Sequence, residues 1–355
     1  MRAAVMRDWE LRVDEVPDPE PGPGQVLTRV LACGICGSDL HMLRHGAELR
    51  AREVELADEF GPDPNALRPV VFEPHLDTVM GHEYCCEVIG LGAGVTGVSE
   101  GDVVVGMPVA LDADGLHTVG YSNRYPGGYA DLMVLDAALL NRVPDGVPPR
   151  LAALTEPLAV GVHAVAKSRT DQAHAAVVLG LGPVGLACVA ELKVRGIGPV
   201  VGADFSSRRR HLAEHLGCDV VVDPRVQPAV AAWREVDGQR PLVVFEAVGV
   251  PGMIDAAMRM APRDTQVLVV GVCMQRDHIH PMSAIGRELN VQFALGYTPD
   301  EFAGSLTKIA DGAVDLEPLL TGSVTVEGVP GAFADLADPE EHAKILVEPD
   351  GTSGA

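Results

Sequence analysis

Basic residues are scarce in this sequence: 27 lysines and arginines stand against 50 aspartates and glutamates, which gives a formal net charge of -23. This charge repels nucleic acid phosphates and anionic lipid headgroups, so neither a nucleic acid nor a membrane surface is an expected partner. Long apolar runs are also missing, since no stretch approaches the roughly 20 apolar residues that span a bilayer. The first residues lack the apolar centre of a signal peptide, and we therefore expect a cytoplasmic location.

Cysteine is neither abundant nor regularly spaced. The seven cysteines form an odd set scattered through a large acidic chain, which argues against a disulfide framework. Apolar residues, by contrast, fill 47% of the 355 positions. That length and that composition predict a globular protein with two domains.

The chain contains two kinds of sequence pattern. Up to about residue 150, short apolar runs such as "QVLTRVLA", "CCEVIGLG" and "GDVVVGMPV" are broken by turn residues, which predicts a mostly β domain. From about residue 158, strand-like runs such as "AAVVL", "DVVVD", "PLVVFEAVG" and "QVLVVGVC" alternate with helical segments, which indicates a doubly wound α/β domain with a parallel sheet. After about residue 290 short mixed elements return and end at "KILVEP". We expect one domain over residues 1–157 and 291–355, and the other over residues 158–290.

Residues 43–79 fit neither of these sequence patterns. Their first half is charged and helix-like and their second half is rich in proline, which indicates an excursion from the β domain. Its position beside the candidate metal ligands described below suggests the wall or lid of a substrate pocket. A packing role or a subunit contact is the alternative.

A dinucleotide-binding pattern opens one predicted helix. "GLGPVG" places Gly180, Gly182 and Gly185 in G-x-G-x-x-G spacing, directly after the strand "AAVVL". The first glycine permits a tight turn, the second lets the backbone approach a pyrophosphate at the helix N-terminus, and the third allows close packing of helix on strand. A glycine-rich turn without a ligand is the alternative, but an acidic residue, Asp204, follows at the expected distance of about 20 residues.

Asp204 bears on the choice of cofactor. A carboxylate at the end of the second strand accepts the ribose hydroxyls of NAD and repels the 2′-phosphate of NADP. Arg208, Arg209 and Arg210 follow closely, and they leave open a phosphate contact, a stacking contact on adenine or a solvated helical turn. We expect NAD. The residues expected to contact it are Gly180, Gly182, Pro183, Val184, Gly185, Asp204, Arg209, Val248 and Gly271.

The stretch "CGICGSDLHMLRHG" concentrates polar chemistry near the N-terminus. Its Cys33 and Cys36 form a C-x-x-C without the second C-x-x-C of a structural zinc site. A redox pair remains an alternative, although the surrounding sequence is not that of a thioredoxin-like motif.

Three motifs in order change the interpretation of this stretch. They are "CGICGSD" at 33–39, "GHEYCCEVIG" at 81–90 and "LTEPLAVGVHA" at 154–164. With the glycine turn, they make the whole chain resemble the zinc-dependent medium-chain dehydrogenase/reductase (alcohol dehydrogenase) family, and "EPLAVGVHA" is most similar to its sorbitol and butanediol dehydrogenase branch. The resemblance implies a Rossmann domain plus a GroES-like catalytic domain, and a homodimer or homotetramer.

The resemblance also implies a metal site. It gives Cys36, His82 and Glu156 as the ligands of one catalytic zinc, with Glu83 as an alternate ligand. Zinc would polarise an alcohol and lower the pKa of its hydroxyl, which makes hydride transfer to NAD feasible. The implied reaction converts a secondary alcohol or polyol to a ketone or aldehyde, reversibly.

Proton transfer is implied for Ser38 and, farther out, for His41, while Asp39 resembles the acid that orients a zinc-bound histidine. Alternatively, Ser38 and Asp39 only cap a helix that begins near residue 37, and His41 is a surface histidine. His45, His75 and His163 are expected to be surface or packing residues, and Cys85 and Cys86 core thiols.

The chain departs from the family pattern in two respects. Cys36 and His82 are 46 positions apart, wider than is usual in the family, because residues 43–79 intervene, and a cysteine-rich lobe is missing. Many relatives carry four closely spaced cysteines for a second, structural zinc, but the corresponding residues 106–135 contain no cysteine. We therefore expect no structural zinc. Two other functions stay open at this point: a zinc-free quinone or enoyl reductase of the same superfamily, and a non-catalytic nucleotide-binding relative.

Overall fold

The computed structural model describes residues 1–60, 72–113 and 115–349, and it forms two compact units. The first unit comprises Met1–Glu156, Leu320–Ala337 and Lys344–Ala355, and the second comprises Pro157–Leu319 and Asp338–Ala343. Each unit has its own sheet system and its own core, so the expectation of a β-rich part and a doubly wound part is confirmed.

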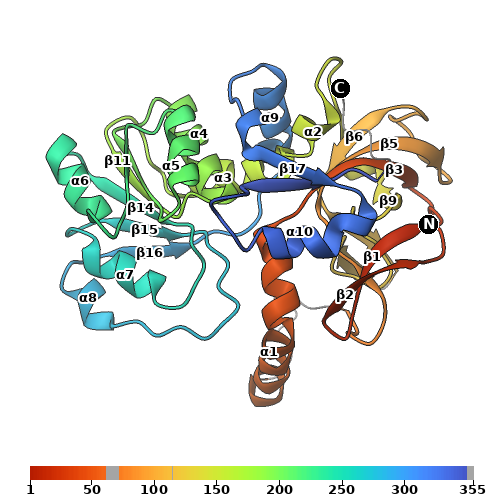
Figure 1. The fold of residues 1–355 in the computed structure, drawn as a ribbon, viewed down its shortest axis with the longest axis horizontal. Coiled ribbons are helices and arrows are strands. Elements are labelled where there is room, and N and C mark those ends of the chain that lie inside the picture. Colours follow the sequence, from red (N-terminus) through yellow and green to blue (C-terminus); the bar gives the residue numbers. More distant parts are fainter. Residues whose placement is uncertain (61–71, 114, 350–355) are drawn as a thin grey trace. The chain divides into compact units, whose positions relative to one another are not determined.

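The first unit consists mainly of antiparallel sheets (Figure 1). Its largest sheet has the order β10-β6-β5-β3-β18-β17, with β9 also paired to β3, and smaller sheets have the orders β2-β1-β4 and β7-β8. Its strands are β1 (Arg2–Arg7), β2 (Glu10–Glu15), β3 (Gln25–Gly34), β4 (Thr78–Val79), β5 (Glu83–Leu91), β6 (Val103–Gly106), β7 (Val109–Asp112), β8 (Gly115–Thr118), β9 (Leu132–Asp136), β10 (Leu140–Arg142), β17 (Leu320–Val324) and β18 (Lys344–Val347).

The pairing of β3 with β5 positions the candidate ligands. These strands are antiparallel, and Gly34 at the end of β3 is opposite Glu83 at the start of β5. The residues after β3 and before β5 must therefore lie close together, although they are far apart in sequence. On its other side β3 pairs with β18, where Gly34 is opposite Leu346, so the C-terminal strand reaches the same place.

The helix α1 (Gly37–Phe60) follows β3 after a short turn. It confirms the helical first half of the excursion, and Figure 1 shows it extending away from the sheets. Arg50 donates to the carbonyl of Phe72 and pairs with Glu73, which links the helix to the chain leading into β4. Residues 61–71 lie outside the described residues, and the role of the excursion as a wall or lid stays a prediction.

The second unit contains a six-stranded parallel sheet. Its order is β13-β12-β11-β14-β15-β16, which is the 3-2-1-4-5-6 order of a dinucleotide-binding fold. The strands are β11 (Ala175–Leu179), β12 (Val200–Ala203), β13 (Val220–Val222), β14 (Leu242–Glu246), β15 (Gln266–Val269) and β16 (Asn290–Phe293), and the helices are α4 (Pro183–Val194), α5 (Ser207–His215), α6 (Ala229–Val236), α7 (Met253–Met260), α8 (Pro281–Ile285) and α9 (Pro299–Ala310).

Alternating side chains of the parallel strands build the core of this unit. Val177 of β11 and Val244 of β14 are fully buried, and Trp233 of α6 and Ala257 of α7 pack in the same apolar cluster. Both faces of the strands are buried, as continuous apolar runs such as "AAVVL" predict for a sheet covered on both sides.

The second unit continues farther than expected. The return to the first domain was expected at residue 291, but β16 pairs in parallel with β15, and α9 follows with buried Phe302 and Leu306. The second unit therefore extends to Leu319. The sequence signal at β16 is weak because the strand is short and its side chains are only partly buried or exposed.

The remaining elements are short, apart from α3, which begins at the boundary between the units. They are η1 (Ala137–Leu139), α2 (Pro149–Ala152), α3 (Thr155–Lys167), η2 (Glu317–Leu319), η3 (Val326–Gly328) and α10 (Val329–Asp335). Within the described residues, no helix combines the length and the apolar character needed to cross a membrane.

Candidate active site

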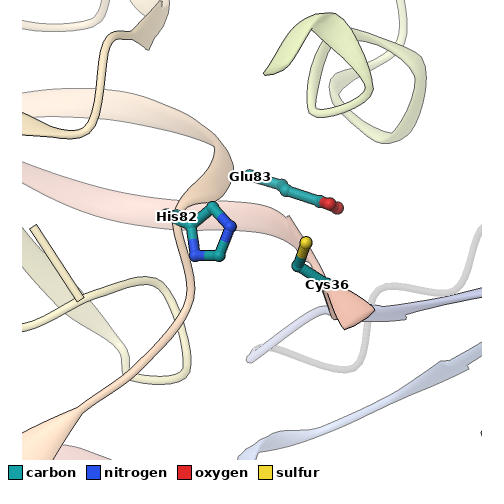
Figure 2. Close-up of side chains that lie close together, drawn as sticks. All are labelled: Cys36, His82 and Glu83. Atoms are coloured by element: carbon teal, nitrogen blue, oxygen red, sulfur yellow. The ribbon is translucent and has the colours of Figure 1, made fainter. Parts of the chain in front are cut away.

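Three potential metal ligands meet where β3 ends and β5 begins. A thiol sulfur from Cys36, a ring nitrogen from His82 and a carboxylate oxygen from Glu83 lie within 4.8 Å of one another, and Figure 2 shows their side chains close together. In the part of the chain that the structure describes, this is the only group of three or more His, Cys, Asp or Glu residues with such spacing.

The donor set fits zinc. Thiolate, imidazole and carboxylate are the ligand types of zinc in proteins, and tetrahedral ligands at their usual bond lengths lie roughly 3.3–3.8 Å apart. The three atoms all lie within 4.8 Å of one another, so they are gathered around a single place where one ion could bind. His82 and Glu83 are buried and Cys36 is half-buried, so a cation here would be largely shielded from solvent.

A fully buried carboxylate stands behind His82. Oδ1 of Asp39 lies 3.5 Å from Nδ1 of His82, although the contact lacks hydrogen-bond geometry and leaves this nitrogen unsatisfied. Burial lowers the pKa of His82, but Asp39 and then Cys36 outweigh it and hold the pKa well above its usual value. Burial likewise raises the pKa of Asp39, whereas His82 and two tyrosine hydroxyls bring it below its usual value. The acidic groups around His82 therefore favour a positive charge at this place, a proton on the ring when no metal is bound or a metal cation beside the neutral ring.

A chain of hydroxyl groups adjoins the same histidine. Oγ of Ser38 lies 3.4 Å from Nε2 of His82, and the hydroxyl of Tyr121 lies 3.1 Å from Oγ of Ser38. The same phenol is 2.5 Å from Oδ1 of Asp39, and Tyr129 donates to Oδ2 of Asp39 at 2.5 Å. Ser38 and Asp39 lie in the first turn of α1. Oδ2 of Asp39 accepts the backbone N–H of Cys36 at 3.4 Å at the start of the helix, whereas the Ser38 hydroxyl contacts His82.

Glu83 has a counter-charge of its own. Nζ of Lys344, the first residue of β18, donates to both carboxylate oxygens at 2.6 and 2.7 Å and to the carbonyl of Ile35 at 3.0 Å. Each of the two charged side chains is 1% exposed. Burial lowers the pKa of Lys344, but Glu83, with contributions from Cys36 and Glu156, raises it above its usual value. Lys344 therefore remains a buried cation that competes with any metal for Glu83.

Glu156 lies outside the group of three ligands. It is buried in the first turn of α3, close enough to contribute to the raised pKa of Lys344. Its direct bond to zinc stays a prediction, while the structure brings Glu83 next to Cys36 and His82.

His41 is half-buried on α1, where its ring stacks on His45 with 6.2 Å between centroids. Burial, His45 and Arg44 lower the pKa of His41, and its part in an outer proton relay stays a prediction.

The neighbouring cysteines are poor nucleophiles. Cys33 is fully buried, and burial raises its pKa well above the usual value, as it also does for Cys85. Burial raises the pKa of Cys86 to about 12. A redox-active thiol needs a low pKa and solvent access, so the geometry disfavours a Cys33–Cys36 redox pair. All seven cysteines are free.

The glycine turn in the second unit has the expected strand, turn and helix context. Gly180 follows β11 with φ of +85°, Gly182 is the N-cap of α4, and Pro183 and Val184 form the first helical positions. A side chain at Gly185 would overlap the carbonyl oxygen of Gly180, so glycine is required there. The free N-terminus of α4 can receive a pyrophosphate.

Asp204 follows β12 and adjoins this turn. Its Oδ2 accepts the backbone N–H of Leu181 at 2.8 Å and lies 3.8 Å from Nη1 of Arg209. Arg210 instead donates to the backbone carbonyls of Asp204 and Phe205. Of Arg208, Arg209 and Arg210, it is therefore Arg209 that pairs with the carboxylate of Asp204.

The ends of β11, β14 and β15 meet beside the turn. A Cβ added to Gly180 would lie 2.8 Å from Val248, and one added to Gly271 would overlap the backbone of Gly249. The buried carboxylate of Glu246 accepts the N–H groups of Val248 and Gly249 at 2.8 and 3.0 Å. The predicted contacts Val248 and Gly271 therefore lie at the carboxyl ends of adjacent parallel strands, where dinucleotides bind in this fold.

Sequence reasoning missed three residues of the metal site: Tyr121, Tyr129 and Lys344. Lys344 could have been noticed because a lysine opens the apolar run "KILVEP", and a buried acid such as Glu83 needs a partner. The two tyrosines lie in the cysteine-free stretch, and their only signal is that buried tyrosine hydroxyls need an acceptor.

Comparisons with known proteins match both units of the chain. The family model described as "Alcohol dehydrogenase GroES-like domain" matches residues 22–145, and the one described as "Zinc-binding dehydrogenase" matches residues 183–311. The (R,R)-butanediol dehydrogenase of Bacillus subtilis (strain 168) is 30% identical, covering 96% of this chain and 97% of its own length. The sorbitol dehydrogenase of Gallus gallus is 28% identical, with coverage of 99% and 97%. The crystal structure of 2R,3R-butanediol dehydrogenase from Bacillus subtilis matches with a TM-score of 0.80 at 28% identity, covering 98% of this chain and 99% of that one.

Proposed function

This chain belongs to the zinc-dependent medium-chain alcohol dehydrogenase family, close to its sorbitol and butanediol branch, and we propose that it oxidises a secondary alcohol or polyol with NAD, reversibly giving a ketone or aldehyde. The observation that carries the proposal is the group formed by Cys36, His82 and Glu83, with the hydroxyl of Ser38 beside it. Metal ligands and a proton-transfer group are the two things that alcohol oxidation needs from the protein.

Cys36 and His82 would hold the zinc together with one carboxylate, from Glu83 or Glu156. When bound, zinc polarises the alcohol oxygen and lowers the pKa of its hydroxyl. Oγ of Ser38, 3.4 Å from Nε2 of His82, is positioned to accept the hydroxyl proton. His41 could carry that proton onward to solvent, at a position where water can replace it.

NAD is the proposed hydride acceptor. Asp204 is placed to receive the ribose hydroxyls and to repel a 2′-phosphate, and its contact with the turn at Leu181 holds its carboxylate beside the helix N-terminus. Arg209 would then lie near the pyrophosphate or the adenine.

We propose one zinc per chain and no structural zinc. The support lies in the stretch that replaces the cysteine-rich lobe, where β7 and β8 form a hairpin closed by polar contacts. Asp112 accepts from His117 at 3.1 Å and from Tyr125 at 3.0 Å, and pairs with Arg124 at 3.0 Å. These contacts hold the hairpin together as a metal would elsewhere.

A homodimer or homotetramer is also proposed, paired through the second unit. β16 is an edge strand of the described sheet, and exposed apolar side chains occur on β16, just after it at Leu295, and on α8. Phe293 is 63%, Leu295 67% and Ile285 65% exposed, and such side chains at a sheet edge favour pairing with a second copy. In sedimentation analysis, Leu295→Glu should shift the protein from the oligomer to the monomer.

We further propose a cytoplasmic location, which the seven free cysteines support.

The test is an alcohol panel read at the NADH absorbance. Purified zinc-loaded protein is assayed with vicinal diols, polyols and simple secondary alcohols, with NAD and with NADP. The proposal expects oxidation of at least one diol or polyol with NAD, lost on chelation and restored by zinc. Turnover of quinones or enones that survives chelation would favour the zinc-free reductase. No turnover with any substrate, in protein that binds both zinc and NAD, would favour the non-catalytic relative.

A further inference from the structure

Asp39 is a buried acid whose partners differ from those of the other acids at this site. It is 0% exposed, like Glu83, but Glu83 is neutralised by Lys344, whereas both oxygens of Asp39 receive tyrosine hydroxyls. A backbone N–H, that of Cys36, also reaches Oδ2 at 3.4 Å. Neutral donors fix the carboxylate in place without cancelling its charge.

We propose that Tyr121 and Tyr129 form a hydroxyl clamp that holds Asp39 against Nδ1 of His82, and that Tyr121 also positions the hydroxyl of Ser38. The clamp makes both tyrosines positioning residues for the zinc ligand. The second part, the action of Tyr121 on Ser38, rests on the proposed alcohol oxidation.

The single proton of the Tyr121 hydroxyl supports the second role of this residue, which is to position Ser38. Its phenol carries a single proton but lies within hydrogen-bond distance of both Asp39 and Ser38, at 2.5 and 3.1 Å. The shorter contact, to a charged oxygen, takes that proton. In the resting site the Ser38 hydroxyl then donates to the phenol oxygen, which leaves a lone pair of Oγ free to accept a hydrogen bond from the substrate hydroxyl. When Ser38 takes up the substrate proton, it releases its own proton toward His41 and solvent.

Tyr129 donates to Asp39 at 2.5 Å and makes a longer contact of 3.4 Å with the carbonyl of Gly34. We therefore assign Tyr129 no role at Ser38. Its ring is fully buried and packs edge-on against Phe333, with 5.9 Å between centroids and 88° between planes. Gly81, which precedes His82, has φ of +103°, and a Cβ there would lie 2.8 Å from the Tyr129 ring. The ring therefore lies directly against the backbone that carries the histidine, and it has little freedom to move.

The clamp gives Asp39 hydrogen-bond donors that carry no charge. A lysine in place of either tyrosine would neutralise Asp39, as Lys344 does for Glu83. Tyrosine hydroxyls stabilise the carboxylate and leave it able to receive Nδ1–H, which orients the ring and raises the basicity of the nitrogen that binds metal.

Zinc release tests the clamp without relying on turnover. Tyr121→Phe and Tyr129→Phe remove one hydroxyl each, and Tyr125→Phe is the matched control because its hydroxyl also donates to a carboxylate, that of Asp112, in the same unit. Transfer of zinc from the holoprotein to a chromophoric chelator should be about 10- to 100-fold faster in the first two variants. It should be unchanged in Tyr125→Phe. Zinc release at the wild-type rate in both Tyr121→Phe and Tyr129→Phe would overturn the proposal.

A variant at the acid separates positioning from general loss of stability. Asp39→Asn should also release zinc faster, and in the Asp39→Asn background neither tyrosine substitution should add its full effect. Fully additive effects, or matching losses of the circular-dichroism melting temperature in the apoproteins, would contradict the clamp.

Separate measurement of kcat and KM tests the second role, the action of Tyr121 on Ser38. With zinc saturating, Tyr121→Phe should lower kcat for alcohol oxidation while KM changes little, and Tyr129→Phe should leave kcat near the wild-type value. Equal kcat losses in both variants would refute the role of Tyr121 at Ser38. Wild-type protein that binds zinc but oxidises no alcohol would refute the proposed function, and the zinc-release result would still decide the clamp.

Discussion

The candidate metal site and the candidate nucleotide site of this protein are built in different ways. Cys36, His82 and Lys344 come from segments far apart in the sequence and meet only because β3 pairs with both β5 and β18. The charged side chains of Asp39, Glu83 and Lys344 at the candidate metal site are buried, and Glu83 is paired with Lys344. The candidate nucleotide site is built largely from one contiguous strand, turn and helix, and the backbone around Gly180 and Gly185 forms its tight turn.

This difference predicts different responses to substitution. A buried charge that loses its partner is costly, so the metal site should be sensitive to changes of a few side-chain atoms. The backbone geometry of a glycine turn survives most side-chain changes around it, so at the nucleotide site only the glycines and Asp204 should be sensitive.

The largest effect is expected at the metal ligands. Cys36→Ala removes the thiol, and without zinc the alcohol proton is not acidified, which is worth several kcal/mol. Alcohol oxidation should fall by about 10⁴-fold or more. Initial rates with excess zinc measure this, and a Cys33→Ala control, at a buried thiol outside the ligand group, should remain active. An active Cys36→Ala enzyme would remove Cys36 from the site.

A slightly smaller effect is expected at the proton-transfer group. Ser38→Ala should keep its zinc but slow alcohol oxidation by about 10²- to 10⁴-fold. Ser38→Thr, which keeps a hydroxyl, should restore much of the rate, and His41→Ala should cost less than Ser38→Ala because water can take its place. Near-normal oxidation by zinc-loaded Ser38→Ala across pH would show that the proton leaves by another route.

Loss of the buried ion pair between Lys344 and Glu83 should lower the free energy of unfolding. Lys344→Met leaves Glu83 buried without its cation, and we expect a loss of about 3–5 kcal/mol in the free energy of unfolding of the apoprotein, measured with urea. The exposed pair of Lys193 with Asp219 is the matched contrast, and Lys193→Met should cost about 0–1 kcal/mol. The double variant Lys344→Met, Glu83→Gln should recover part of the loss. Equal costs for the two lysines would contradict the distinction between the sites.

The smallest effect concerns the cofactor. Asp204→Ala removes a charged acceptor of ribose hydroxyls, worth about 1.5–3 kcal/mol, so kcat/KM for NAD should fall by roughly ten to over a hundredfold. NADP should gain relative to NAD because the repulsive charge is gone. A parallel fall for both cofactors would show that Asp204 does not select between them.

Much of the nucleotide site could be predicted from the sequence because its geometry is local. The spacing of Gly180, Gly182 and Gly185 after an apolar strand places the turn, and the distance to Asp204 places the acid at the end of the next strand. What the sequence did not reveal is the length of this unit, because the weakly apolar β16 gives little sign that it joins the sheet.

The metal site could be predicted only in part. The resemblance supplied Cys36 and His82, but the choice between Glu83 and Glu156 depends on tertiary geometry, which places Glu83 in the ligand group. The partners Tyr121, Tyr129 and Lys344 depend on strand pairing and burial over long sequence separations. No local pattern marks a tyrosine as the donor to a buried acid.

The central claim is a single catalytic zinc held by Cys36 and His82, and metal content tests it most directly. Wild-type and His82→Ala proteins are loaded with zinc, passed over a chelating column and analysed for zinc per chain by elemental analysis. The account predicts one zinc per chain in the wild type and close to none in His82→Ala. Two firmly held zincs in the wild type, or an undiminished zinc in His82→Ala, would contradict it.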